Sequence, residues 1–139
     1  GIDPKQIKGI ISGGKKKIKI MKGFTDKIED PEIKTGIIKV AGTAESIFQN
    51  FQKDPKDIKA ARQFITYYMD AVINILQQYA AIPEGASGKK DFRKKVIELL
   101  RTANASFEKQ LTRLYEDDYL NLASEMSVLE KTLKSEGMM

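Results

Sequence analysis

The chain has 139 residues, of which 41% are apolar, and it carries a formal net charge of +5 at pH 7. It contains neither cysteine nor histidine, which excludes disulfides, thiolate ligands and the imidazoles that serve most metal sites and proton transfers. Its longest weakly charged stretch, residues 71–83, is shorter than the ~18 to 20 residues that a membrane-spanning helix needs. Composition therefore indicates a soluble single domain or elongated bundle, without the residues on which most enzymes depend.

The basic residues are concentrated at the N-terminus. Residues 1–28 contain eight lysines and two aspartates, a net charge of +6, whereas the rest of the chain carries −1. Such a segment suits an anionic membrane surface or a nucleic acid backbone, of which we expect the membrane surface. The lysines predicted to bind this surface or another anion are Lys15, Lys16, Lys17, Lys19 and Lys22. A solvated lysine face without a ligand is the alternative, because exposed lysine runs are common.

Three Asp-Pro pairs, beginning at positions 3, 30 and 54, mark the expected starts of three helices. The aspartate accepts hydrogen bonds from the free N–H groups of the first turn, and proline suits the first helical position. The first helix is predicted over residues 4–29. One of its faces carries Ile7, Ile11, Ile18, Met21, Thr25 and Ile28. Gly13 and Gly14 each weaken its middle by roughly 1 kcal/mol relative to alanine, so we expect a bend or fraying there.

The next two helices have stronger apolar stripes, with the three- and four-residue spacing of a buried face. Residues 31–52 carry Ile33, Ile37, Val40, Ala44, Ile47 and Phe51, with Phe48 beside them. Residues 55–81 carry Ile58, Ala61, Ile65, Tyr68, Val72, Ile75 and Tyr79, and Phe64, Met69 and Leu76 widen the stripe. A loop over residues 82–88, containing proline and two glycines, then reverses the chain.

The stretch from Lys89 to Glu136 has neither proline nor glycine and predicts one very long helix, or two collinear helices. A continuous helix of this length would span roughly 70 Å. Its apolar stripe consists of Phe92, Val96, Leu99, Ala103, Phe107, Leu111, Leu114, Leu122, Met126, Leu129 and Leu133. Asp118 stands where another apolar residue is due. Either the helix bends at this point, or a carboxylate faces the bundle.

No segment alternates polar and apolar residues with a period of two. We therefore predict an all-α fold, an elongated antiparallel bundle of three to four long helices in which the C-terminal helix is the longest. Residues 30–139 would form the bundle. Residues 1–29 would form a basic amphipathic helix at its periphery.

The acidic residues of the long helix provide one candidate metal site. Asp117, Asp118 and Glu125 could bind magnesium or calcium through oxygen ligands, because Glu125 follows Asp118 by seven residues and lies on the same helical face. A helix break or an ion pair with a lysine is the simpler interpretation of this acidic run. A di-iron bundle site would need histidine, which the chain lacks. We expect no cofactor.

Other candidate chemistry is weak. Residues 9–16 come close to the phosphate-binding loop G-x-x-x-x-G-K-[ST], but Lys16 replaces the hydroxyl residue and a helical pattern replaces the preceding strand. No serine is accompanied by a base, so nucleophilic catalysis has no supporting constellation. Tyr68 and Tyr79 fall on an apolar stripe rather than on a basic face, which argues against a nucleic acid partner.

The third and fourth predicted helices resemble the 5-bromo-4-chloroindolyl phosphate hydrolysis proteins, the XpaC-like family of bacteria. The resemblance begins with Asp54-Pro55 and Phe64-Ile65-Thr66-Tyr67-Tyr68, followed by Leu76 and Tyr79. It continues with Phe107-Glu108, Leu111, Leu114, Asp118, Val128-Leu129-Glu130, Leu133 and Glu136-Gly137. One departure is Met69-Asp70, which stands where the family pattern has Leu-Pro, so a kink at this point is not expected.

The resemblance implies a link to hydrolysis of an indolyl phosphate and an association with proteins of the toxic-anion resistance type. It supplies no catalytic residue, and the chain offers only scattered arginines, Arg62, Arg93, Arg101 and Arg113, for phosphoryl charge. We therefore expect a non-catalytic helical scaffold or adaptor, cytoplasmic and held at the inner face of the membrane by its basic segment. The alternative is a phosphate-ester hydrolase that uses a metal bound by Asp117, Asp118 and Glu125.

Overall fold

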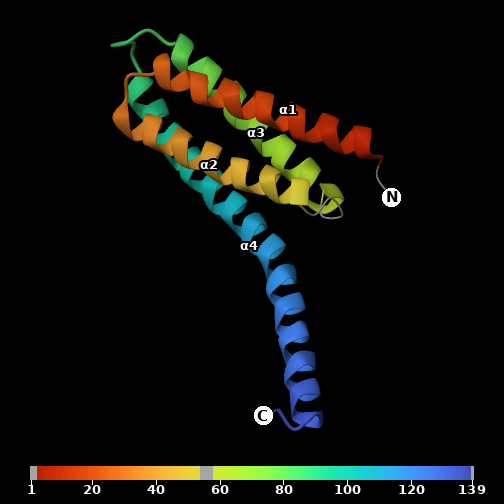
Figure 1. Cartoon of the computed structure of the whole chain (residues 1–139). Helices are drawn as coiled ribbons and strands as arrows, with labels where there is room; N and C mark the ends of the chain where they lie inside the picture. Colours follow the sequence, from red (N-terminus) through yellow and green to blue (C-terminus); the bar gives the residue numbers. More distant parts are fainter. Residues whose placement is uncertain (1–2, 54–57, 139) are drawn as a thin grey trace.

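A computed structural model describes residues 3–53 and 58–138, without the side chains of residues 59–61 and 64. It consists of four α-helices and one 3-10 helix (Figure 1). Their bounds are α1 Pro4–Gly23, η1 Phe24–Asp26, α2 Pro31–Lys53, α3 Ile58–Ala81 and α4 Lys89–Ser135. The described residues form no strand, and α4, with 47 residues, is the longest helix. The predicted all-α fold with its long C-terminal helix is confirmed.

Two of the three Asp-Pro pairs begin helices as predicted. Asp3 accepts a hydrogen bond of 2.9 Å from the backbone N–H of Lys5 at the start of α1. Asp30 accepts from the backbone N–H groups of Glu32 and Ile33, at 3.0 and 3.2 Å, at the start of α2. The pair at positions 54 and 55 lies outside the described residues.

The first helix ends earlier than predicted. It stops at Gly23 rather than near residue 29, because the chain tightens into η1 and then turns toward α2. The backbone N–H groups of Lys27 and Ile28 both donate to the carbonyl of Phe24. This turn buries the side chains of both Phe24 and Ile28.

The helix α1 runs without interruption from Pro4 to Gly23, through Gly13 and Gly14, where we expected a bend or fraying. Gly14 instead permits a close approach of two helices. A Cβ atom at this position would lie 2.3 Å from ring atoms of Phe48 in α2, whereas one at Gly13 would meet nothing within 4 Å. The absent side chain of Gly14 therefore determines how closely α1 packs on α2.

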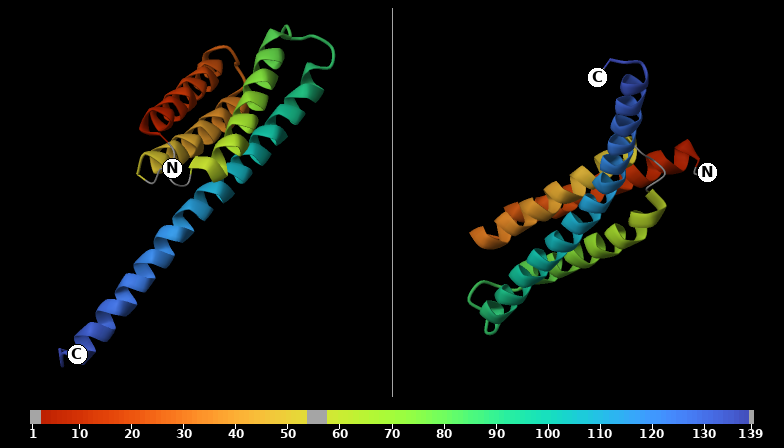
Figure 2. Two further views of the ribbon diagram at one scale, coloured as in Figure 1. Left: turned by 90° about the vertical axis from the view of Figure 1, so that its right-hand side faces the viewer. Right: turned by 90° about the horizontal axis from the view of Figure 1, so that it is seen from below.

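The four helices form a bundle in which α1 and α4 each pack against both α2 and α3 (Figure 2). The helices α1 and α4 thus occupy opposite corners. Every apolar residue predicted on the stripe of α2 is fully buried, and Ile11, Ile18 and Met21 bring α1 into the same core. On α4 it is Leu100, not the predicted Leu99, that is buried, and Gly36 of α2 leaves room for it.

The second half of α4 leaves the bundle (Figures 1 and 2). Leu114 is its last buried side chain, and every residue from 115 to 138 except the half-buried Leu133 is exposed. The prediction that Leu122, Met126 and Leu129 continue the buried stripe is therefore wrong for this chain alone. The helix is continuous past Asp118, which lines a small hollow with Asn50 and Lys53 where α2 ends. We call residues 115–135 the arm.

None of the described helices is both long enough and apolar enough to cross a lipid bilayer.

Candidate functional site

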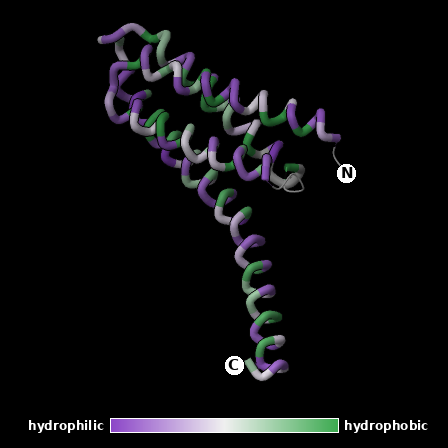
Figure 3. Tube along the Cα trace, viewed as in Figure 1, coloured by the Kyte–Doolittle hydropathy of each residue, from purple (hydrophilic) through white to green (hydrophobic). Residues whose placement is uncertain are grey.

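The arm is an exposed helix with many apolar side chains. Six of them, Tyr115, Tyr119, Leu122, Met126, Leu129 and Leu133, follow one another at spacings of four, three, four, three and four residues. The exposed fractions of Tyr119, Leu122 and Leu129 are 68%, 55% and 58%. Apolar and polar segments alternate along the arm in Figure 3. We call these six residues the seam.

The five lysines predicted to bind an anionic surface fall into two groups. Lys15, Lys16 and Lys19 are exposed and form no ion pair with any described residue. With Lys8 they line a shallow hollow of about 430 Å³ on α1, whose lining also includes Gln52 of α2. We call these four residues the lysine face.

The other two lysines are engaged within the bundle. Lys17 forms an ion pair of 2.9 Å with Asp70 of α3, and Lys22 forms one with Glu45 of α2. Both pairs are partly exposed, so each contributes at most about 1 kcal/mol to stability. Their positive charge is therefore less available to a ligand than that of the lysine face.

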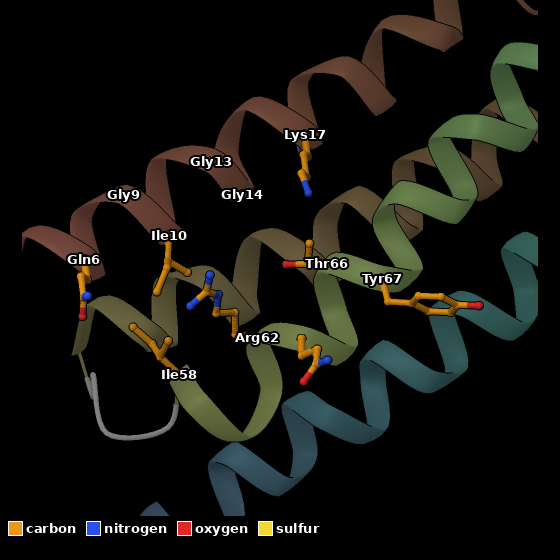
Figure 4. Close-up of a pocket in the computed structure, with 11 residues that line it drawn as sticks. Gln6, Gly9, Ile10, Gly13, Gly14, Lys17, Ile58, Arg62, Thr66 and Tyr67 are labelled. Atoms are coloured by element: carbon orange, nitrogen blue, oxygen red, sulfur yellow. The ribbon is translucent and has the colours of Figure 1, made fainter. Parts of the chain in front are cut away.

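A hollow of about 930 Å³ lies between α1 and α3 (Figure 4). Gly9 and Gly13 contribute no side chain to the α1 side of this groove. Lys17 extends into the groove from α1, and Arg62 extends into it from α3. Two cationic side chains facing one hollow could hold an anion such as a phosphate ester. Sequence reasoning treated Arg62 as isolated, because only the packing of α1 on α3 brings it near Lys17.

The groove lacks a recognisable catalytic constellation among its described side chains. Thr66 and Tyr67 supply hydroxyls, but the described lining residues include no carboxylate to act as a base. Asp70 lies nearby, and it is already paired with Lys17. The groove therefore offers the charge of Arg62 to an anion, whereas the charge of Lys17 is already paired with Asp70.

A polar cluster joins the start of α2 to the start of α4. Arg93 donates hydrogen bonds to the carboxylates of Asp30 and Glu32. Burial raises the pKa of Asp30, but the hydrogen bonds from Arg93 and from the backbone N–H groups of Ile33 and Glu32 outweigh burial and bring this pKa below its ordinary value. The cluster therefore links the first turns of α2 and α4.

The loop that leads into α4 is fixed by Lys89. Its Nζ atom donates to the carbonyl of Ile82 and pairs with Glu84 at 2.8 Å. It also lies 4.9 Å from the ring centroid of Tyr79. Burial raises the pKa of the Tyr79 hydroxyl, which favours its neutral form. These contacts support the bundle, and they gather no reactive groups.

The predicted carboxylate ligands are all on the arm. Asp117, Asp118 and Glu125 are exposed. Within the part of the chain that the structure describes, no group of three or more carboxylates converges on a common point that could hold a metal. The arrangement therefore adds no support for a metal centre at these residues.

Comparison with known families gives one match. The model of a family described as "5-bromo-4-chloroindolyl phosphate hydrolysis protein" matches residues 2–129. The match covers the bundle and most of the arm, and it confirms the resemblance seen in the sequence. Neither a curated protein nor a solved structure shows significant similarity to the chain.

Proposed function

Because the chain belongs to the family of 5-bromo-4-chloroindolyl phosphate hydrolysis proteins, we propose that it serves that hydrolysis as a non-catalytic helical adaptor. The observation that carries this proposal is the arm, whose seam is apolar and exposed. Monomeric proteins rarely expose contiguous apolar surface unless it binds something. The bundle then acts as a rigid base from which the arm reaches a protein partner.

The lysine face gives the adaptor a second binding surface. It lies on α1, at the corner of the bundle opposite α4. Each lysine near an anionic membrane contributes about 1 kcal/mol of attraction. We propose that the lysine face holds the protein at the inner, cytoplasmic face of the membrane. The arm would then be free for its partner, for which a protein of the toxic-anion resistance type is our candidate.

Membrane binding can be tested with vesicles. The intact chain should sediment with vesicles that contain phosphatidylserine and stay in solution with pure phosphatidylcholine, and added salt should release it. Changing Lys15, Lys16 and Lys19 together to glutamine should weaken binding by about two orders of magnitude. The matched control changes Lys39, Lys94 and Lys109, which are exposed elsewhere. Equal loss in both variants, or binding that ignores salt, would refute this part.

Catalysis by the chain itself is the second candidate, favoured by the family description and by the groove that holds Lys17 and Arg62. A hydrolase must activate water or a nucleophile and stabilise phosphoryl charge. In this alternative the metal would be bound by Asp117, Asp118 and Glu125.

The deciding assay measures turnover of 5-bromo-4-chloroindolyl phosphate by the purified chain, with and without magnesium, manganese or zinc. The adaptor proposal predicts no turnover under any of these conditions. Metal-dependent turnover that disappears in a folded Asp117→Ala, Asp118→Ala variant would replace the adaptor by a carboxylate hydrolase. Turnover that is lost on Arg62→Gln would instead place catalysis in the groove.

A further inference from the structure

The seam of the arm is a surface distinct from the bundle core. The buried stripe of α4 runs through Phe107 and Leu114, and its continuation along the helix falls on Asp118, Asn121 and Glu125, which are polar. The seam begins one residue later, at Tyr115. Since successive residues are about 100° apart around a helix, the seam faces a different side from the buried stripe.

The spacing of the seam is that of a coiled coil. Alternating steps of four and three residues give an average of 3.5, the repeat that lets one helix pack along another for its whole length. In heptad terms Tyr119, Met126 and Leu133 occupy a positions. Tyr115, Leu122 and Leu129 occupy d positions. The expected occupant of the seam is thus a second helix.

The charged residues beside the seam determine which partner helices can bind to it. The flanking e and g positions hold Glu116, Asp118, Glu125 and Glu130, together with the neutral Ala123 and Thr132. All the flanking charges are negative. The basic Lys131 and Lys134 occupy the outer f and b positions, away from a partner helix.

A second copy of the arm fits this pattern poorly. In a parallel pair, g faces the e position of the next heptad, so Glu125 of one copy would lie opposite Glu130 of the other. In an antiparallel pair, acidic e and g residues of one copy would still lie opposite acidic e and g residues of the other. Like charges at these positions destabilise the pairing. An anionic membrane would be repelled for the same reason.

We propose that the arm binds an amphipathic helix of another protein whose apolar seam is flanked by lysine or arginine, and that the two helices form a short heterotypic coiled coil. This inference rests on the proposed adaptor function and specifies the chemistry of its partner. The apolar seam supplies affinity, and the acidic flanks supply the choice of partner.

The test uses the intact chain and three synthetic 28-residue helical peptides, whose binding is followed by fluorescence anisotropy. The first peptide has leucine and isoleucine at a and d with lysine at e and g. The second has glutamate at e and g, and the third keeps the lysines but has serine at a and d. We expect the affinity of the first peptide to be at least about ten-fold higher than that of the second, and we expect the third not to bind.

Matched variants locate the binding site. Leu122→Ser with Leu129→Ser should abolish binding of the first peptide, whereas Val128→Ser, which removes an exposed side chain outside the seam, should leave it unchanged. Glu125→Lys with Glu130→Lys should invert the preference toward the glutamate peptide. Circular dichroism should show that every variant retains its helix content.

Three results would overturn the inference. Equal binding of the lysine and glutamate peptides would show that the acidic flanks do not select the partner. The proposed adaptor function, in which the arm binds a helix, would still stand. Absence of binding to the folded chain would refute helix docking at the seam. A dimer in sedimentation that Leu122→Ser with Leu129→Ser dissociates would make a second copy the occupant. The proposed adaptor function is tested by a separate measurement, because turnover of the indolyl phosphate by the purified chain would refute it.

Discussion

The two halves of α4 have comparable numbers of apolar residues but opposite surroundings. Residues 89–114 place Val96, Leu100, Ala103 and Phe107 against α2 and α3, where they are at most 3% exposed. In the arm, only Tyr115 at the start of the seam lies beside α2, and the seam residues from Tyr119 to Leu129 are more than half exposed. The same three- and four-residue periodicity thus signals a core in one half and a docking surface in the other.

The comparison shows that helical periodicity identifies an apolar face but not its partner. The helix α2 ends and α3 begins near the place where α4 leaves the bundle (Figures 1 and 2), and Leu114 is the last buried residue of α4. Most helical stability in proteins comes from such tertiary packing. The two halves of α4 should therefore differ sharply in their response to substitution.

Removal of a large core side chain from the packed half should have the largest effect. Phe107 is fully buried, so Phe107→Ala should lower the free energy of unfolding by about 3 to 5 kcal/mol through lost burial and a cavity. In the arm, Leu122→Ala should change it by less than about 0.5 kcal/mol. Urea denaturation measures both. A large loss from Leu122→Ala would mean that the arm is packed in solution.

Hydrogen exchange should separate the two halves of α4 without any substitution. Backbone amides of residues 118–134 should open with a free energy about 2 kcal/mol or more below that of residues 96–110, because the arm has few buried contacts. Mass spectrometry of exchanged peptides provides the measurement. Addition of the lysine-flanked peptide should raise protection in the arm alone. Uniform protection along α4 would contradict the division.

The contact between α1 and α2 should respond to a single methyl group. Gly14→Ala places a Cβ atom against the ring of Phe48, and we expect destabilisation of about 1 to 3 kcal/mol as the helices separate. Gly13→Ala is the matched control one residue away. It has open space and should stabilise the chain by about 0.5 to 1 kcal/mol. Equal effects at both positions would argue against the close approach.

The polar cluster at Asp30 should produce a smaller, pH-dependent effect. Its pKa is lower in the folded chain than the ordinary value of 3.8, so its contribution is present above the unfolded pKa and disappears as the pH falls through the folded pKa. At pH 7 Asp30→Asn, which preserves the helix cap, should lower the free energy of unfolding by about 1 kcal/mol.

The pH profile supplies the check on Asp30. The difference between the original chain and Asp30→Asn should shrink below about pH 4 as the carboxylate becomes protonated. Asp26→Asn, a change at an exposed aspartate of η1, serves as the control. A difference that persists unchanged at pH 3 would show that the charge of Asp30 contributes nothing.

The sequence by itself determined the all-α fold, the starts of α1 and α2 and the buried face of α2. The Asp-Pro pairs at positions 3 and 30 begin helices because cap and proline geometry are local properties. The stripe of α2 is buried residue for residue, because its spacing leaves one apolar side. The family was also recognisable, since its motifs are short runs of residues in the third and fourth helices.

Only the tertiary structure decided where the packing ends and which charges meet. No local signal shows that Gly14 faces the ring of Phe48, or that Arg62 shares a groove with Lys17, because these neighbours are far apart in the chain. Leu122, Met126 and Leu129 were predicted to be buried for the same reason, and they are exposed. A helix specifies its own apolar face, but the lengths and positions of the other helices determine whether that face is covered.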